Sequence, residues 1–137
     1  MSETASKPVP HPDAESQPYW DGAAEGRLRL QRCTSCGAMR HYPQLVCTQC
    51  YATGVEPFDA SGDGTVHSWT IAHHAFHPAF KGELPYVLLT VDLPEGPRVL
   101  GRFAGPAESL RLDLPVRVSF PRNEAGTPLP LWTATGD

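Results

Sequence analysis

The sequence predicts a mostly-β protein with a short N-terminal helix, a small metal-bound ribbon and a closed barrel of five strands. Three observations predict this fold. The only four cysteines of the 137-residue chain are paired as C-x2-C-x10-C-x2-C. Fifteen prolines and twelve glycines favour short strands and turns over long helices. The second half of the chain alternates apolar and polar residues in short runs that are separated by turn residues.

The chain is expected to begin with a disordered arm over residues 1–17, which are rich in proline and polar residues and nearly free of apolar ones. A short helix is predicted next, led by Ser16 or Gln17, with Pro18 in its first turn and Gly26 at its end. The following run, Arg27–Arg32, alternates like a strand. We therefore expect a helix and ribbon over residues 18–56 and a barrel over residues 57–137.

The cysteine spacing predicts a structural zinc site. A tetrahedral zinc ion needs four thiolates at about 2.3 Å, and two C-x-x-C turns supply them in pairs. The ten-residue spacer is long enough for a hairpin that places the second pair opposite the first. Gly37 follows the first pair, where a positive φ is common, whereas Tyr51 follows the second and could strain that turn. The predicted ligands are Cys33, Cys36, Cys47 and Cys50.

Other uses of the four cysteines fit less well. Two disulfides would need an oxidising compartment, but the first residues lack a secretory signal and no run is apolar enough to span a membrane, so we expect a cytoplasmic protein. A thioredoxin-like redox pair would have a single C-x-x-C in a βαβ unit. Iron, which the same four ligands bind in rubredoxins, remains an alternative to zinc.

Five runs predict the strands of the barrel, and glycine- or proline-containing turns separate them. Five short strands of this kind favour a small closed barrel, for which the five-stranded OB-fold is the common solution. The runs are Thr65–Ala72, Pro85–Leu93, Arg98–Ala104, residues 116–120 and Leu129–Thr133.

The charges are unevenly distributed along a chain whose net charge is −4. Residues 27–51 contain four arginines and no acidic residue, so a basic ribbon is expected on an acidic barrel. A single-stranded nucleic-acid-binding module is therefore an alternative function, in which Trp69 and Phe103 would stack on bases. The acidic barrel argues against it, because nucleic acid requires a basic binding face.

Four segments together resemble a known family: YWDGAAEGRLRLQRCTSCGAMRHYPQLVCTQC, SGDGTVHSWT, PYVLLTVDLPEGPRVLGRF and LPVRVSF. They are similar to the acyl-CoA-associated OB-fold family with an N-terminal rubredoxin-like zinc ribbon, also called domain of unknown function 35. The likeness extends from about Tyr19 to Trp132. Tyr51 and the histidine-rich loop after Ala72 depart from the family pattern.

The resemblance implies a non-catalytic accessory or scaffold subunit that works beside a thiolase, a thiolase-like aldolase or an enoyl-CoA hydratase. Such a chain would assist assembly and accommodate a CoA thioester. The partner enzyme would catalyse a thiolase reaction or the retro-aldol cleavage of a steroid side chain. It would be no enzyme by itself but a required subunit of a lyase or acyltransferase complex. The residues agree, since all four thiols are assigned to the metal and no G-x-S-x-G motif is present.

The loop between Ala72 and Leu84 is the main candidate for contact with a partner or an acyl-CoA. Its aromatic tip is costly to leave in water, and long loops between paired strands are uncommon unless they bind something. A second metal site, a general base and an ordinary packed loop are the alternatives. With two ribbon arginines added, the predicted contact residues are Arg29, Arg40, His73, His74, Phe76, His77 and Phe80.

Overall fold

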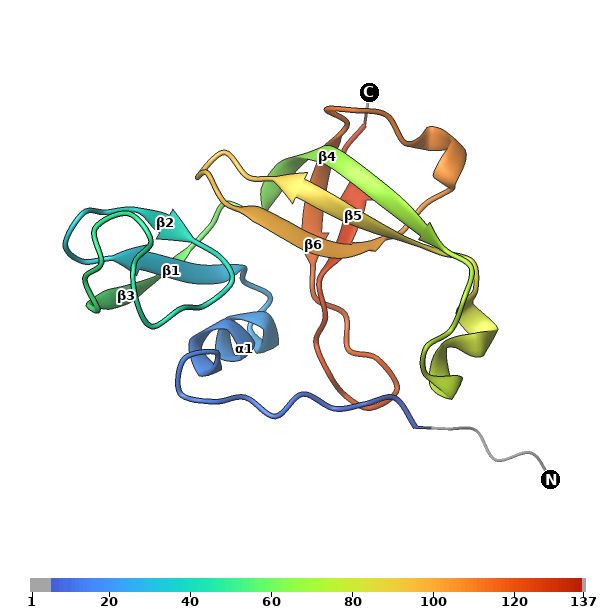
Figure 1. Cartoon of the computed structure of the whole chain (residues 1–137). Coiled ribbons are helices and arrows are strands. Elements are labelled where there is room, and N and C mark those ends of the chain that lie inside the picture. The colour runs from blue at the N-terminus through green and yellow to red at the C-terminus, as the bar shows by residue number, and fades with distance from the viewer. Residues whose placement is uncertain (1–5, 137) are drawn as a thin grey trace.

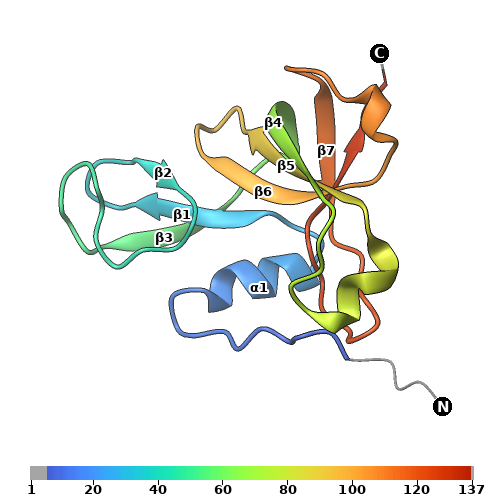
Figure 2. The ribbon, with the colours of Figure 1, turned by 45° about the vertical axis from the view of Figure 1, so that its right-hand side comes forward.

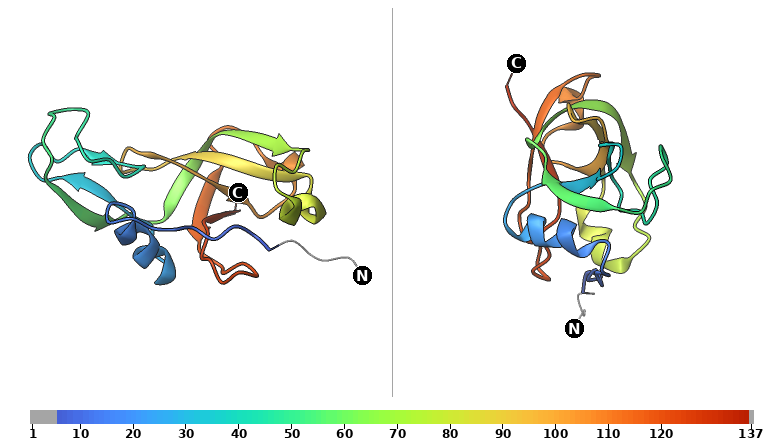
Figure 3. Two further views of the ribbon diagram at one scale, coloured as in Figure 1. Left: turned by 60° about the horizontal axis from the view of Figure 1, so that its bottom comes forward. Right: turned by 90° about the vertical axis from the view of Figure 1, so that its left-hand side faces the viewer.

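The computed structural model describes residues 6–136 and shows a small ribbon sheet beside a barrel (Figure 1). The predicted mostly-β fold is confirmed: the regular elements are one α-helix, a three-stranded sheet, a closed five-stranded barrel and two short 3-10 helices. The ribbon sheet projects from one side of the barrel (Figure 2). The helix and the N-terminal arm lie on the same side of both sheets (Figure 3).

The elements follow the predicted order. They are α1 (Gln17–Ala24), β1 (Arg29–Cys33), β2 (Met39–Arg40), β3 (Val55–Asp59), β4 (Asp63–Ala72), the 3-10 helix η1 (Pro78–Glu83), β5 (Tyr86–Asp92), β6 (Arg98–Phe103), the 3-10 helix η2 (Ala107–Ser109), β7 (Pro115–Ser119) and β8 (Leu131–Ala134).

The ribbon is an antiparallel sheet with the strand order β2-β1-β3. The sequence analysis did not predict β3, whose side chains are mostly exposed and whose middle residue is Pro57. Its pairing with β1, which sets Leu30 opposite Phe58, makes it a strand. Because β3 pairs with β1, the ribbon sheet extends to Asp59 and β3 crosses the boundary predicted after residue 56.

The barrel has the strand order β4-β5-β6-β8-β7 and closes where β4 pairs with β7. All five predicted strands are present. β6 and β8 are parallel and the other neighbours antiparallel, which is the connectivity of an OB-fold. Its centre is filled by side chains that alternate inward along each strand. The fully buried ones are Val66, Leu89, Val91, Val99, Val116 and Trp132.

A bulge in β4 changes which of its residues share a face. The register shifts between Val66 and Ser68, so that Val66 lies opposite Val91 and Trp69 lies opposite Leu89. Opposite residues of an antiparallel pair point to the same face, and Leu89 and Val91 are both fully buried. Trp69 therefore points to the same face as Val66, although its side chain remains 37 % exposed, and His67 lies at the bulge and is exposed.

Lys7 holds the N-terminal arm against the barrel. The Lys7 side chain forms ion pairs with Glu83, which ends η1, and with Glu124, which lies between β7 and β8. The disorder predicted for residues 1–17 falls partly on residues 1–5, which are outside the described residues. Lys7 thus joins the arm to two loops of the barrel.

An aromatic stack joins the helix, the ribbon and the barrel. The ring of His41 lies 4.0 Å from that of Tyr42 and 5.1 Å from that of Tyr19, measured between centroids, and Tyr19 also contacts Phe120. The Tyr42 hydroxyl accepts a hydrogen bond from the Leu100 N–H of β6 at 3.1 Å. These contacts fix the ribbon relative to the barrel.

His41 makes this joint sensitive to acid. Burial lowers the pKa of His41 to about 4, and its Nε2 is buried without a hydrogen-bond partner among the described residues. An unfolded histidine titrates near pH 6.5, so the unfolded chain binds the proton more readily than the folded one. The free energy of unfolding contributed by this group is therefore greatest above about pH 6.5 and falls as the pH decreases toward 4.

We expect His41→Phe to keep the stack while removing this dependence on pH. Between pH 7 and pH 4.5 the wild-type chain should lose about 1–3 kcal/mol more stability than the variant, because only the wild type must protonate a buried ring. Urea unfolding at several pH values measures the difference. His67→Phe is the control, since His67 is exposed. Equal pH profiles for the wild type and His41→Phe would contradict the prediction.

Candidate metal centre and docking surface

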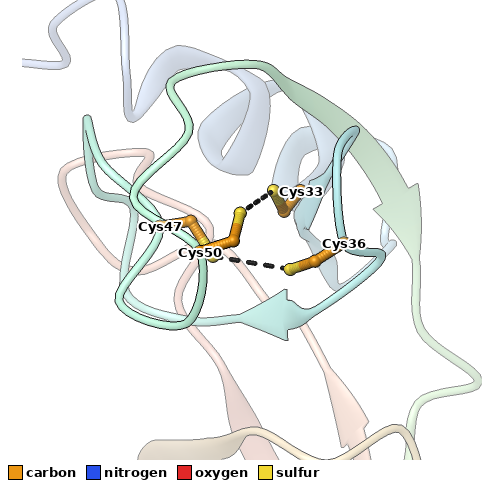
Figure 4. A group of neighbouring side chains, drawn as sticks. All are labelled: Cys33, Cys36, Cys47 and Cys50. Atoms are coloured by element: carbon orange, nitrogen blue, oxygen red, sulfur yellow. Dashed lines mark hydrogen bonds between the residues drawn. The ribbon is translucent and has the colours of Figure 1, made fainter.

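The four cysteine sulfurs converge at the tip of the ribbon. Figure 4 shows Cys33 and Cys36 on one loop facing Cys47 and Cys50 on the other. All four Sγ atoms lie within 4.8 Å of one another, with 3.6 Å between Cys33 and Cys50 and 3.7 Å between Cys36 and Cys47. Four sulfurs bound to one zinc ion at about 2.3 Å would be about 3.8 Å apart by tetrahedral geometry. The arrangement therefore fits a tetrahedral metal ion.

The two cysteine loops have the same backbone geometry. The N–H of Gly37 donates to the carbonyl of Cys33 at 2.9 Å, and the N–H of Tyr51 donates to the carbonyl of Cys47 at the same distance. Both following residues have a positive φ, 77° at Gly37 and 65° at Tyr51. Tyr51 thus adopts the turn that glycine favours, and the departure from the family pattern leaves the ligand geometry unchanged.

Backbone N–H groups favour the thiolate form at the first cysteine of each pair. Those of Cys50 and Gln49 point at the sulfur of Cys47 and lower its pKa to about 6, and the corresponding groups of Cys36 and Ser35 lower the pKa of Cys33. The thiolate is the form that binds a metal. A closed set of four sulfurs leaves no open coordination position, which is typical of structural sites rather than catalytic ones.

The arginines of the ribbon are largely neutralised by carboxylates that the fold brings to them. Asp59 of β3 accepts from Arg29 Nε at 2.8 Å and pairs with Arg27 at 3.1 Å, and these arginines hold the pKa of the Asp59 carboxyl below its usual value. Arg29 also pairs with Glu25. Arg40 differs, because it donates to Gln31 Oε1 and to the Gln44 carbonyl and has no carboxylate partner among the described residues. Of the two predicted contact arginines, only Arg40 is left without a carboxylate.

The loop between β4 and β5 presents its aromatic side chains in two directions. Phe76 is 93 % exposed and lies edge-on to the exposed ring of His74. Phe80 is partly buried, packs near Tyr86 and lies under the ammonium group of Lys7. His77 Nδ1 accepts from the Ala79 N–H and so caps η1.

The predicted site residues therefore separate into an outward set and an inward set. His73, His74 and Phe76 can meet a partner, whereas His77 and Phe80 are engaged within the loop. Within residues 6–136, the cysteines form the only cluster of three or more His, Cys, Asp or Glu side chains with metal-ligand spacing. The three loop histidines do not form one.

Sequence reasoning missed a cavity of about 410 Å³ on the barrel. Its walls come from the arm, η1, β5, β6 and the connection between β7 and β8, and residues so far apart in the chain give no local pattern. The chain also contains no helix, within its described residues, that has the length and apolarity required to cross a bilayer.

Comparison with known proteins identifies the family. Residues 20–56 match the family model described as ChsH2, rubredoxin-like zinc ribbon domain. Residues 59–121 match the model described as ChsH2, C-terminal OB-fold domain. The chain belongs to the ChsH2 family. The ribbon and the barrel found in the structure are the two domains of this family, in the same order.

A solved structure titled "Ltp2-ChsH2(DUF35) aldolase" is similar to most of this ChsH2-family chain. The TM-score is 0.83 at 30 % identity, and the match covers 93 % of this chain and 100 % of the other. The DUF35 resemblance drawn from the sequence is thereby confirmed.

Two curated relatives are named as hydratase subunits. The "Probable enoyl-CoA hydratase alpha subunit" of Thermomonospora curvata is 33 % identical over 93 % of this chain. The "3-oxo-4,17-pregnadiene-20-carboxyl-CoA hydratase alpha subunit" of Mycobacterium tuberculosis is 35 % identical over 80 % of it. This chain spans only 40 % and 37 % of the length of these relatives.

The residue after each cysteine pair offers a matched test of the ribbon. We expect Tyr51→Gly to stabilise the metal-loaded chain by about 0.5–1 kcal/mol, because glycine relieves the positive φ and the Tyr51 side chain is 79 % exposed. Gly37→Ala should destabilise it by about 1 kcal/mol, because alanine is strained at the positive φ of this position. Nothing lies within 4 Å of the added Cβ, so no steric clash contributes to this cost. Thermal unfolding with the metal bound measures both. Effects of the same sign would contradict the shared geometry.

Proposed function

We propose that this chain is a non-catalytic subunit that docks on a thiolase-like or hydratase-like enzyme and assists it in processing an acyl-CoA. The main support is the similarity to a chain of the structure titled "Ltp2-ChsH2(DUF35) aldolase". The match covers the full length of that chain. Two relatives named as acyl-CoA hydratase subunits support the same class of partner. A steroid acyl-CoA is the substrate that the name of one relative favours, and a retro-aldol cleavage is the reaction that the aldolase title favours.

The metal we propose is zinc, bound by all four cysteines. The sulfur spacing fits it, and the matching family model is named a zinc ribbon. Zinc has no redox chemistry under these conditions and would serve as a structural link between the two cysteine loops. The four unpaired thiols also suit a reducing compartment, which supports a cytoplasmic location.

The docking contacts we propose are two separate regions: the tip of the β4–β5 loop, and Arg40 on the ribbon, which projects from the opposite side of the barrel (Figure 1). Phe76, His73 and His74 form an exposed aromatic tip that a partner pocket would bury. Arg40 supplies a cation that can meet a carboxylate of the partner or a phosphate of CoA. Both regions belong to the predicted contact set. In the folded chain the Phe76 ring is exposed to solvent, and Arg40 has no carboxylate partner among the described residues.

A single-stranded nucleic-acid module is the second function considered, and the barrel does not favour it. Base stacking needs exposed aromatic faces on the OB-fold surface. The ring of Tyr86 is covered by the guanidinium of Arg102 at 4.1 Å, and that of Phe80 faces Lys7 at 5.4 Å. Of the two rings predicted to stack on bases, Phe103 is buried, and Trp69 is 37 % exposed. Two of the surface rings therefore already bind cations of the same chain.

We expect natively purified protein to contain one zinc ion per chain, measured by elemental analysis. Cys33→Ser should release the metal and unfold the ribbon while the barrel strands remain, because zinc binding in isolated fingers supplies about 10–16 kcal/mol of folding free energy. Amide exchange measured by mass spectrometry would locate the loss of protection. Ser35→Ala, next to a ligand in the same loop, is the control that should retain zinc. Iron in place of zinc, or a ribbon that stays protected in Cys33→Ser, would overturn the metal assignment.

Isolation of the native complex tests the docking proposal. Mass spectrometry should identify a thiolase-superfamily or hydratase subunit in fixed stoichiometry with this chain. Phe76→Ser should weaken that association at least about fivefold, because a buried aromatic anchor typically contributes more than 1 kcal/mol. Leu112→Ser is the matched control, since Leu112 is another exposed apolar residue, 67 % exposed, on the connection between β6 and β7. A stable free monomer, or equal effects of the two substitutions, would contradict the proposal.

A further inference from the structure

The cavity of about 410 Å³ lies on the face of the barrel that OB-folds commonly use for ligands. Its floor comes from β5 and β6, the second and third barrel strands, and its sides from the β4–β5 and β7–β8 connections. In OB-folds this face and these two loops are the usual binding region. In Figure 1 both connections lie at the lower end of the barrel, beside the N-terminal arm. The place of the cavity in the fold is therefore that of a ligand site.

The walls of the cavity are mostly apolar, as in small-molecule sites. Its volume falls within the range of about 300–1,000 Å³ that is typical of ligand pockets. Leu129, one of the lining residues, remains 40 % exposed. The apolar lining consists of Phe80, Leu88, Pro121, Leu129, Pro130 and Leu131.

The rim of the cavity carries one positive charge in excess. Glu83 accepts ion pairs from Lys7 and Arg102, and Glu124 pairs with Lys7 as well. The third cation, Arg122, donates only to the carbonyl of Gly126, at 2.7 Å, and has no carboxylate partner among the described residues. The rim thus holds three cations and two carboxylates, and both carboxylates are paired with Lys7 or Arg102. Arg122 is the one with charge and N–H donors available to a ligand.

We propose that this cavity binds a small organic anion with a hydrocarbon body and a single carboxylate or phosphate group. The hydrocarbon lies against Leu88 and Leu131, and the anionic group meets Arg122. An uncharged hydrocarbon would leave Arg122 unused, and a highly charged polymer would find too few free cations. The inference does not rest on the proposed docking function, because every residue involved belongs to this chain and no partner is required.

Binding is tested with octanoate, octyl phosphate and octanol on the zinc-loaded full chain, by NMR chemical-shift titration at pH 7. Either anion should bind more tightly than octanol, and the tighter of the two identifies the preferred head group. Arg122→Gln should weaken the better anion about three- to fivefold, the range of a partly exposed ion pair, and leave octanol unchanged. Arg111→Gln is the matched control, because Arg111 is exposed, has no ion pair among the described residues and does not line the cavity.

A blocking substitution checks that the cavity itself is the site. Leu88→Trp should abolish binding of all three probes by filling the space. Leu112→Trp adds a bulky ring at an exposed residue of the β6–β7 connection, outside the lining, and should not. Amide spectra of both variants verify folding, and Arg122→Gln provides a second test if Leu88→Trp does not fold. Equal affinity for octanol and the anions, or binding that survives Leu88→Trp in a folded chain, would overturn the proposal.

Discussion

The ribbon depends on the convergence of four sulfurs, because it has too little core to fold on apolar burial alone. Its buried apolar side chains are few, chiefly Leu30 with the cysteines Cys33 and Cys47, while Leu45, Val46 and Tyr51 are exposed. Small modules of this kind need a metal or a disulfide as a staple. The residues of the two cysteine loops act mainly on the geometry of the sulfurs, through positive φ angles and N–H groups that favour thiolates.

The position of the ribbon on the barrel is fixed by a few aromatic contacts, one hydrogen bond and a group of ion pairs. Tyr42 reaches the backbone of β6, His41 stacks between Tyr19 and Tyr42, and Asp59 holds the arginines that begin β1. Most of the ribbon's positive charge is used within the chain to orient it. A basic stretch in the sequence is therefore not a basic surface here, and Arg40 is the notable exception.

Local patterns predicted the cluster of four cysteines and the five barrel strands, because C-x-x-C spacing and period-two alternation are properties of short segments. They failed where partners lie far apart in the chain. β3 is a strand through its pairing with β1, and Asp59 neutralises Arg29 across 30 residues. The bulge between Val66 and Ser68 is likewise a property of the pairing of β4 with β5, which the sequence of β4 alone does not show. The cavity on the barrel has walls from five segments and no signature in any of them.

The β4–β5 loop links the two surfaces proposed for this chain. Phe76 points into solvent and Phe80 lines the cavity, and the two are separated by one turn that His77 caps. Glu83, at the end of the same loop, holds both Lys7 of the arm and Arg102 of the cavity rim. The exposed ring offered to a partner and the ring that lines the cavity therefore belong to one short segment, and η1 fixes the direction of each.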